Sequence, residues 1–297
     1  MTTRAPIVIP AATKHTATDG KSSSLEYSDP HSAIPMDASN SPQTLLSSPT
    51  PAPPKNTILK TKRRTALSQS AHSRSSLRHI SFIFPTAPTI PITANNSFRM
   101  PGWYDIASFT SLAHKTHDVP GILSSRETLH ALVAREVAEK KIPQHRIVVG
   151  GFSQGGAMAL IGGLSTPSAT APTGDAATST LGGVFALSGY LLLPERFAAI
   201  IDGEDAEAGA KKGDVARATP IWMGHGVDDP LVRCEWGRET AGRLRAWGWG
   251  VDWNEYRYED SDPASRQHSA DAQELADLEQ WLEKRLPAVE GSGGGGA

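Results

Sequence analysis

Ser153 stands in a Gly-x-Ser-x-Gly motif over residues 151–155, between an apolar run and a helical pattern. A strand-to-helix turn of this kind is the setting of a nucleophile elbow, in which glycines permit a tight turn and expose the serine hydroxyl above the sheet. The N-terminus of the following helix would then face the negative charge that develops in a reaction. The alternative is a glycine-rich turn with a bystander serine. We predict that Ser153 is a nucleophile.

A serine hydroxyl becomes a good nucleophile only when a base takes its proton. In an elbow of this kind the chain order is serine, acid, histidine. His268 is the only histidine after the acid candidates and lies in a loop before the C-terminal helix, so we predict it as the base, with a surface-loop histidine as the alternative. Asp228 and Asp229 both follow a predicted strand. We favour Asp229 as the acid that orients the histidine, with Asp228 as the alternative, and we assign His225 to bracing the turn.

Other kinds of chemistry find no support in the sequence. It contains no His-Glu-x-x-His, no Walker sequence and no Gly-x-Gly-x-x-Gly after a strand. The single cysteine, Cys234, excludes an internal disulfide framework and a cysteine-cluster metal site. We therefore expect neither a metal nor an organic cofactor. The net charge of −2 argues against a general polyanion binder, so no nucleic-acid partner is expected.

The elements that must position these residues follow from the apolar patterns. Runs typical of buried strands occupy residues 80–84, 146–150, 183–187 and 220–223, with a weaker strand pattern over 251–258. Helical patterns begin at a capping box of Ser124 and Glu127 and recur over 154–164, 235–247 and 270–285. Residues 85–105 are predicted to form a long loop. Strands that alternate with helices indicate an α/β fold with a mostly parallel sheet flanked by helices.

The composition divides the chain into four segments. With 38% hydrophobic residues, 27 glycines and 22 prolines, the 297-residue chain is expected to hold one compact domain diluted by disordered segments. Residues 1–18 contain an apolar run between prolines, predicted as an N-terminal edge strand of that domain. Residues 19–76 are predicted to be a low-complexity, disordered insert, residues 77–288 the α/β domain, and residues 289–297 a flexible glycine-rich tail.

Charge and hydropathy also indicate where in the cell the protein is located. Residues 55–78 carry seven Lys or Arg and no acid, which indicates a solvated basic linker, with a nuclear-import signal or a site for an acidic partner as the alternative. No run of eighteen apolar residues is present, and the apolar start of the chain is interrupted by prolines. We therefore expect no membrane span and no signal peptide, and a cytoplasmic location with a nuclear one in addition.

Longer motifs resemble the acyl-protein thioesterase/lysophospholipase group of the α/β-hydrolases, in the form found in filamentous fungi. The most specific piece is Pro-Gly-Trp-Tyr-Asp-Ile at residues 101–106. Other matching pieces lie at residues 5–18, 84–88, 146–158, 189–191, 225–232 and 268–275. The resemblance implies the α/β-hydrolase fold and a triad of Ser153, Asp229 and His268 that works through an acyl-enzyme.

The same resemblance implies the substrate. It points to hydrolysis of palmitoyl thioesters on protein cysteines, so that S-acylated proteins are the partners and membrane contact is peripheral, through those substrates only. The loop from 86 to 103, with Met100 and Trp103, would help to line an acyl-chain groove. One alternative is a carboxylesterase or lysophospholipase that acts on small or lipid esters. The other is a catalytically impaired hydrolase-fold binding protein.

One part of the family pattern is missing from the sequence. After residue 18 the family continues into an apolar strand and a His-Gly-Leu-Gly-Asp loop that supplies a second oxyanion N–H, whereas this chain reads Asp-Gly-Lys-Ser over residues 19–22. The backbone N–H of Gln154 then remains as the oxyanion donor. Loss of a central strand beside the nucleophile strand would leave two unpaired strand edges. We interpret residues 19–76 as a wrongly translated segment, with an inactive natural variant as the alternative.

Overall fold

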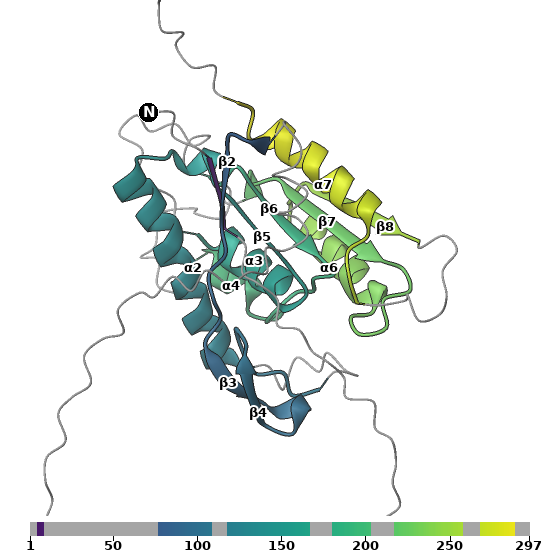
Figure 1. Cartoon of the computed structure of the whole chain (residues 1–297). Helices are drawn as coiled ribbons and strands as arrows, with labels where there is room; N and C mark the ends of the chain where they lie inside the picture. Colours follow the sequence, from purple (N-terminus) through teal and green to yellow (C-terminus); the bar gives the residue numbers. More distant parts are fainter. Residues whose placement is uncertain are drawn as a thin grey trace, which may run out of the picture. The chain divides into compact units, whose positions relative to one another are not determined.

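The central sheet of this computed structural model contains six parallel strands in the order β2-β1-β5-β6-β7-β8 (Figure 1). The structure describes residues 5–8, 77–108, 118–166, 180–202, 217–257 and 268–288. Within them, the strands of the sheet are β1 Ala5–Val8, β2 Ile80–Ile83, β5 Val148–Phe152, β6 Gly183–Leu187, β7 Ile221–Gly226 and β8 Val251–Tyr256. The predicted α/β fold with a mostly parallel sheet is confirmed.

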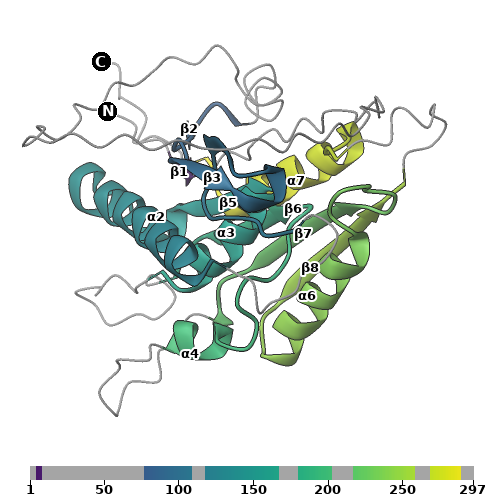
Figure 2. The same cartoon turned by 90° about the horizontal axis from the view of Figure 1, so that it is seen from below.

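Helices flank this sheet on both faces. They are α2 Val119–Lys140, α3 Gln154–Leu164, α4 Phe197–Asp202, α6 Cys234–Ala246 and α7 Ala272–Arg285, with short 3-10 turns η2 Thr93–Asn95 and η4 Gln144–Arg146. Figure 2 shows α7 on one side of the sheet and α2, α3 and α6 on the other. The bounds of α3 and β6 are those predicted from the sequence, and β2, β5, β7, β8, α6 and α7 agree to within a few residues.

Successive side chains of the inner strands enter opposite core layers, as the two-residue period of a strand requires. In β6, Val184 and Ala186 pack in the layer that also holds residues of α2, α3 and α6. Phe185 and Leu187 pack in the layer that holds residues of α7. Because both faces are buried, the central strands are continuous apolar runs, which is why the sequence pattern reveals them.

β1 lies inside the sheet and not at its edge, so the edge position predicted for it was wrong. It pairs in parallel with β2 on one side and with β5 on the other. Ile7 and Val8 are each 0% exposed and enter different core layers. A strand with both ladders used and both faces covered can only be internal. The slot beside the nucleophile strand, where the sequence suggested a gap, is therefore occupied by the start of the chain.

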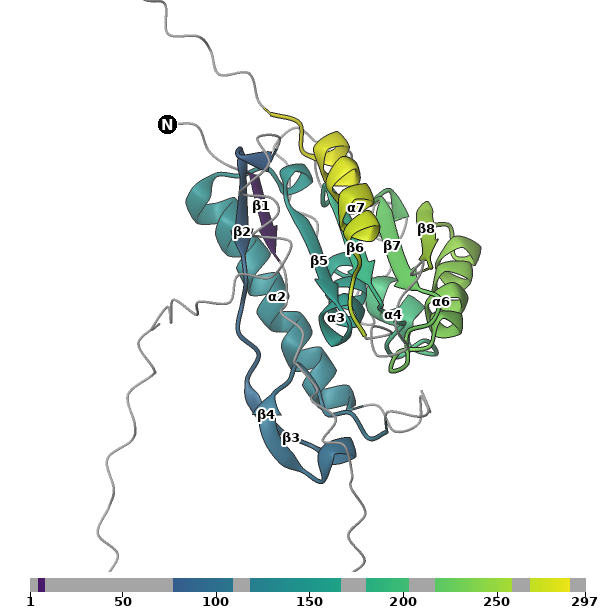
Figure 3. The same ribbon diagram turned by 45° about the vertical axis from the view of Figure 1, so that its right-hand side comes forward.

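The strand order has a topological switch point beside β5. Going from β1 the chain adds β2 on one side, and it later adds β5 on the other side (Figure 3). Connections that leave neighbouring parallel strands in opposite directions open a crevice at their carboxyl ends, which is where open α/β sheets bind ligands. Ser153 directly follows β5 and therefore lies at this switch point.

Residues 85–105 contain a hairpin where the sequence predicts a loop. β3 (Thr89–Ile92) pairs antiparallel with β4 (Phe98–Pro101), and η2 joins them. Prolines made this stretch resemble a loop, but a two-stranded ribbon has only outer edges, where a residue without an N–H is tolerated. The chain turns through Asn96 and Ser97, both in the left-handed region at φ 51° and 58°.

α2 begins at Val119 and not at Ser124, where the capping box predicts its start. The N-cap is Asp118, whose side chain accepts a hydrogen bond from the Gly121 N–H at 3.0 Å. Proline in the first turn, where its missing N–H costs nothing, supports the earlier start. Ser124 therefore lies inside the helix.

Several sequence predictions fall outside the described residues. These are the insert over residues 19–76, in which the family's second strand and oxyanion loop are missing, and the tail over residues 289–297. Among the helices that are described, none is both long and apolar enough to span a membrane.

Candidate active site

Ser153 occupies a strained turn between β5 and α3. Its backbone has φ 56° and ψ −124°, a conformation that costs a non-glycine residue about 1–3 kcal/mol and that clusters at functional sites. A Cβ on Gly151 would lie 2.5 Å from the carbonyl carbon of Gly155, so the tight turn requires glycine there. The Ser153 N–H donates to the Leu187 carbonyl at 2.8 Å and ties the turn to β6. These contacts are those that a nucleophile elbow needs.

Asp229 is the acid that contacts His268. Its Oδ2 accepts a hydrogen bond from His268 Nδ1 at 2.7 Å, while Oδ1 accepts from the N–H groups of Leu231 and Val232, both at 2.9 Å. Burial alone would raise the pKa of Asp229, but the bond to His268 and the two backbone N–H groups hold this pKa below its usual value. Asp228, the alternative acid, is exposed.

The second ring nitrogen of His268, Nε2, is not used by the bond to Asp229. The ring centroid of His268 lies 4.5 Å from that of Phe152, the residue before Ser153. The Nε2 atom is buried and has no hydrogen-bond partner among the described residues, so His268 packs against the residue before Ser153 but is not hydrogen-bonded to Ser153. Catalytic hydrogen bonds are often formed only once substrate is bound. With Nδ1 held by Asp229, Nε2 is the nitrogen that can accept a proton.

His225 braces the loop that carries the acid. It is 0% exposed, and its Nε2 donates to the Val232 carbonyl at 2.8 Å. Burial lowers its pKa and so favours the neutral ring, although Asp229 Oδ2 lies 3.9 Å away. Within the part of the chain that the structure describes, no three His, Cys, Asp or Glu side chains stand where they could hold a metal ion.

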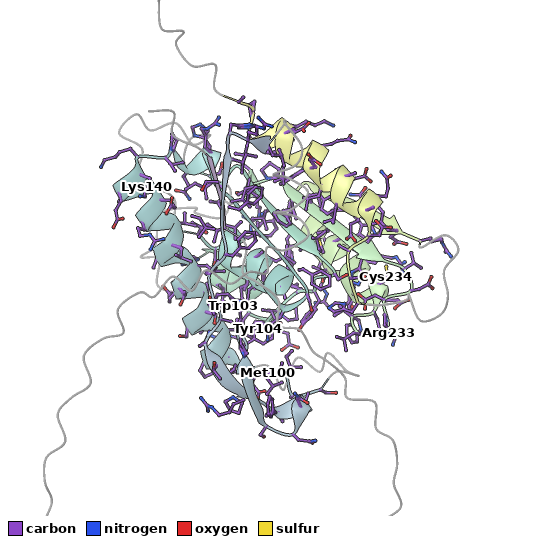
Figure 4. All side chains as sticks on the ribbon, viewed as in Figure 1. Met100, Trp103, Tyr104, Lys140, Arg233 and Cys234 are labelled. Carbon is purple, nitrogen blue, oxygen red and sulfur yellow. The ribbon has the colours of Figure 1, made fainter. Side chains whose placement is uncertain are left out.

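The residues that the resemblance assigns to substrate binding lie on and beside the hairpin (Figure 4). Met100, on β4, is half-buried and accepts a 3.5 Å contact from Asn95 Nδ2. Trp103 follows the hairpin and is 2% exposed, so its ring belongs to the core. Gln154, the predicted oxyanion donor, is the first residue of α3, where backbone N–H groups lie beyond the helix's own hydrogen-bond ladder.

A buried carboxyl group, Glu274, escaped the sequence analysis. It lies in the first turn of α7, is 0% exposed, and neither carboxyl oxygen has a hydrogen-bond partner among the described residues. Burial, then the charges of Asp271 and Asp229, raise the pKa of Glu274 to about 8. A Cβ on Gly224 would lie 2.6 Å from Glu274 Oε1, so β7 makes room for this carboxyl. An acid four residues before Leu278, on the apolar face of the helix, is the sequence signal that could have revealed it.

Sequence comparisons identify a protein family and related proteins that match this chain. A model of the family described as phospholipase/carboxylesterase matches residues 62–286. An acyl-protein thioesterase 1 from Gibberella zeae is 38% identical over 217 residues, which cover 72% of this chain and 80% of that protein. One from Neurospora crassa is 39% identical over 219 residues, which cover 73% of this chain and 78% of that protein.

Solved structures show the same similarity. The crystal structure of Arabidopsis thaliana SOBER1 matches with a TM-score of 0.59 and 28% identity, over 73% of this chain and 90% of that one. The crystal structure of Zea mays acyl-protein thioesterase 2 matches with a TM-score of 0.57 and 25% identity, over 74% of this chain and 87% of that one. The residues that the family model matches include Ser153, Asp229 and His268.

Proposed function

The chain belongs to the phospholipase/carboxylesterase family, as its motifs predict, and on that premise we propose that it is a thioesterase that removes long-chain acyl groups from protein cysteines. The observation that carries the proposal is the 2.7 Å bond between Asp229 and His268 beside the strained turn of Ser153. The names of the Gibberella and Neurospora relatives favour S-acylated proteins as substrates. Membrane contact would come only through those substrates. The proposed location of the protein is the cytoplasm and the nucleus.

In the first half of the proposed reaction, Asp229 holds the Nδ1–H of His268, so that Nε2 accepts the proton of the Ser153 hydroxyl. The serine oxygen attacks the carbonyl carbon of the thioester. The tetrahedral intermediate collapses, the C–S bond breaks, and His268 returns the proton to the cysteine sulfur. An acyl-serine and a free protein thiol result.

The second half repeats these steps with water. His268 takes a proton from a water molecule, which attacks the acyl-serine, and the C–O bond to Ser153 breaks as His268 protonates the serine oxygen. The products are the fatty acid and the free enzyme. The two half-reactions need no redox change and no group beyond the three side chains, an oxyanion donor and water.

The negative charge on the carbonyl oxygen of the tetrahedral intermediate would be stabilised at the N-terminus of α3, where the Gln154 N–H donates a hydrogen bond to it. The second donor of the family comes from the loop that is missing from this sequence over residues 19–76. Removal of one oxyanion donor typically lowers kcat by about 10²–10³. We therefore expect slow turnover.

Two other functions are favoured by particular observations. The family description includes carboxylesterase, so small or lipid esters, including lysophospholipids, could be the main substrates with the same three side chains. The Asp-Gly-Lys-Ser sequence in place of the oxyanion loop favours a binding protein that retains the fold without turnover. Preference for oxygen esters over the palmitoyl thioester separates the first from our proposal, and binding without product separates the second.

The direct test is hydrolysis of a palmitoyl-cysteine peptide by the purified 297-residue chain, followed as release of free thiol. We expect thiol release that the Ser153→Ala variant abolishes, and a higher kcat/KM for the palmitoyl thioester than for a butyryl ester. Preference for the butyryl ester would favour the carboxylesterase. Binding of the peptide without thiol release would favour the inactive binding protein, and either result would overturn the proposed thioesterase.

A further inference from the structure

Glu274 lies at the start of a helix but turns its side chain into the protein. Asp271 is the N-cap of α7, and its Oδ1 accepts a hydrogen bond from the Glu274 N–H at 2.6 Å. In a capping box, a glutamate three residues after the N-cap bonds back to the N–H of the cap residue. Neither carboxyl oxygen of Glu274 makes this hydrogen bond, and the side chain is 0% exposed. The carboxyl group is therefore buried without the partner that its position in the helix offers.

The groups that face this carboxyl are apolar or acidic. On β7, a Cβ at Gly224 would lie 2.6 Å both from Oε1 of Glu274 and from the ring of Trp222, so the carboxyl lies against the strand. In the described part of the chain, the titratable groups whose charges interact with it are Asp271 on its own helix, Asp229 after β7 and Tyr256 on β8. Burial, and then the charges of Asp271 and Asp229, raise the pKa of Glu274 to about 8. The neutral acid is thus the form that this site favours.

The neutral carboxyl is coupled to both members of the predicted catalytic pair. Asp229 is near enough for its charge to act on Glu274, and its Oδ2 accepts the 2.7 Å bond from His268 Nδ1. Only residues 269 and 270 separate His268 from the N-cap of the helix that carries Glu274. A charge on Glu274 therefore acts on the acid through space, and a movement of the first turn of α7 acts on the base through the chain.

Loss of the proton would leave a carboxylate that the present contacts do not stabilise. Between α7 and β7 it has no hydrogen-bond partner among the described residues, and it faces the charges of Asp271 and Asp229. A buried charge without a partner is costly, whereas water and the N–H groups of the helix start can stabilise it outside. Because β7 blocks movement inward at Gly224, the side chain can leave only as the first turn of α7 opens. This movement would draw His268 away from Asp229.

We propose that neutral Glu274 is a positioning residue for the pair of Asp229 and His268, and that its ionisation releases His268 and sets the alkaline limit of activity. The positioning half of this inference concerns the fold alone. The activity half rests on the proposed hydrolase function. The two halves are tested by different measurements.

One substitution removes the titration and keeps the shape of the side chain. Glu274→Gln puts a neutral amide of the same length where the neutral acid lies, so that nothing ionises there as the pH rises. Glu283→Gln is the matched control, because it makes the same chemical change at a half-buried position in the last turn of α7, at the opposite end of the helix from Asp271. Thermal melts at pH 7 and pH 9 verify that each protein is folded under the conditions used.

Proton NMR tests the positioning without any substrate. A proton in a short hydrogen bond between a histidine and a carboxylate gives a resolved signal far downfield. We expect this Nδ1–H signal of His268 at pH 7, identified by its absence in His268→Ala. At pH 9 it should have lost about nine-tenths of its intensity in the unaltered chain and in Glu283→Gln, and it should persist in Glu274→Gln. A signal that persists in the unaltered chain, or an equal loss in Glu274→Gln, would overturn the proposal.

The pH dependence of kcat/KM for a butyryl ester tests the activity, with each protein compared with its own value at pH 7. We expect kcat/KM at pH 9 to be about tenfold lower in the unaltered chain and in Glu283→Gln. In Glu274→Gln it should be less than about twofold lower, because the group that ionises has been removed.

Two results would overturn the activity half. An equal fall in Glu274→Gln would mean that another group sets the alkaline limit. A rise of kcat/KM in the unaltered chain above pH 8 would mean that the added charge assists His268 and does not release it. If the unaltered chain hydrolyses no ester, the proposed function and the activity half fail together, while the NMR signal still decides the positioning half.

Discussion

At the scale of single residues, the bond between Asp229 and His268 decides which ring nitrogen is left for chemistry. Asparagine in place of Asp229 can offer its amide hydrogen to Nδ1, which places the proton on Nε2 and removes the base. We expect Asp229→Asn to lower kcat by about 10³–10⁴ while the protein stays folded. Asp228→Asn is the control, because Asp228 is an exposed neighbour outside the triad. Ester kinetics with a thermal melt measure both, and a loss of less than tenfold in Asp229→Asn would contradict the assigned role.

Glu274 predicts a dependence of stability on pH. Its pKa of about 8 in the folded chain lies above the usual value of 4.5, so folding favours the protonated form. Between these two pH values the folded chain binds a proton that the unfolded chain has lost, and stability falls as the pH rises through this window. Above pH 8 the group is ionised in both states, and this contribution to the slope ends.

Glu274→Gln removes this group's titration and keeps the shape of the side chain. Relative to the unaltered chain, the variant should gain on the order of 2–4 kcal/mol in unfolding free energy between pH 5 and pH 8. Urea unfolding at the two pH values measures the difference. Equal stability changes in both proteins would mean that Glu274 is ionised in the folded chain at pH 5.

At the scale of elements, the contact between β5 and α3 depends on glycine in the elbow. A Cβ on Gly151 would lie 2.5 Å and 2.6 Å from backbone atoms of Gly155, so Gly151→Ala must push strand and helix apart. We expect a loss of about 1–3 kcal/mol in unfolding free energy and a lower kcat, because the serine moves. Urea unfolding and ester kinetics measure these effects.

Gly242 supplies the control in another helix. It is exposed within α6, and a Cβ there meets nothing within 4 Å. Gly242→Ala should therefore raise the unfolding free energy by about 0.5–1 kcal/mol, through helix propensity alone. If Gly151→Ala were as stable as Gly242→Ala, the close contact at the elbow would not exist.

Elements differ in how far the sequence predicts them. Buried parallel strands such as β6 are continuous apolar runs, and α3 follows its strand directly, so both were predicted with their bounds. The hairpin was missed because prolines hide a ribbon that has no inner strand. The start of α2 was misplaced because two residues, Asp118 and Ser124, could each cap a helix, and only the fold chooses between them.

The residues of the candidate site also differ in how far the sequence predicts them. The chain order of serine, acid and histidine predicts Ser153 and His268, because strand ends of a parallel sheet meet at one edge. It does not choose between Asp228 and Asp229, and the contact of Asp229 with His268 appears only in the structure. The contacts of the Gln154 side chain with residues 103–104 join segments 50 and 51 residues apart, and no local pattern predicts such a contact.

At the scale of the whole molecule, a short N-terminal strand completes the sheet. β1 lies between β2 and β5 and joins both core layers through Ile7 and Val8. The sequence placed it at an edge, because the three apolar residues between Pro6 and Pro10 do not reveal how many neighbours a strand has. Its position removes the unpaired edges that a missing central strand would leave.

The central place of β1 predicts a large effect from a small change near the chain start. Ile7 is 0% exposed, so Ile7→Ala should lower the unfolding free energy by about 2–4 kcal/mol. Phe98→Ala, at a side chain that is 66% exposed, should change it by less than about 0.5 kcal/mol. Urea unfolding of both variants measures the difference. A stable Ile7→Ala protein would show that residues 5–8 are not part of the sheet.

The central claim is that Ser153 is activated by His268 although the family's second oxyanion loop is missing from the sequence. The measurement that tests it most directly is labelling of the purified 297-residue chain with a fluorophosphonate probe, which reacts with activated serines. We expect labelling of the unaltered chain, none in Ser153→Ala, and strongly reduced labelling in His268→Ala. Absence of labelling in a folded sample, or equal labelling in Ser153→Ala, would contradict the claim.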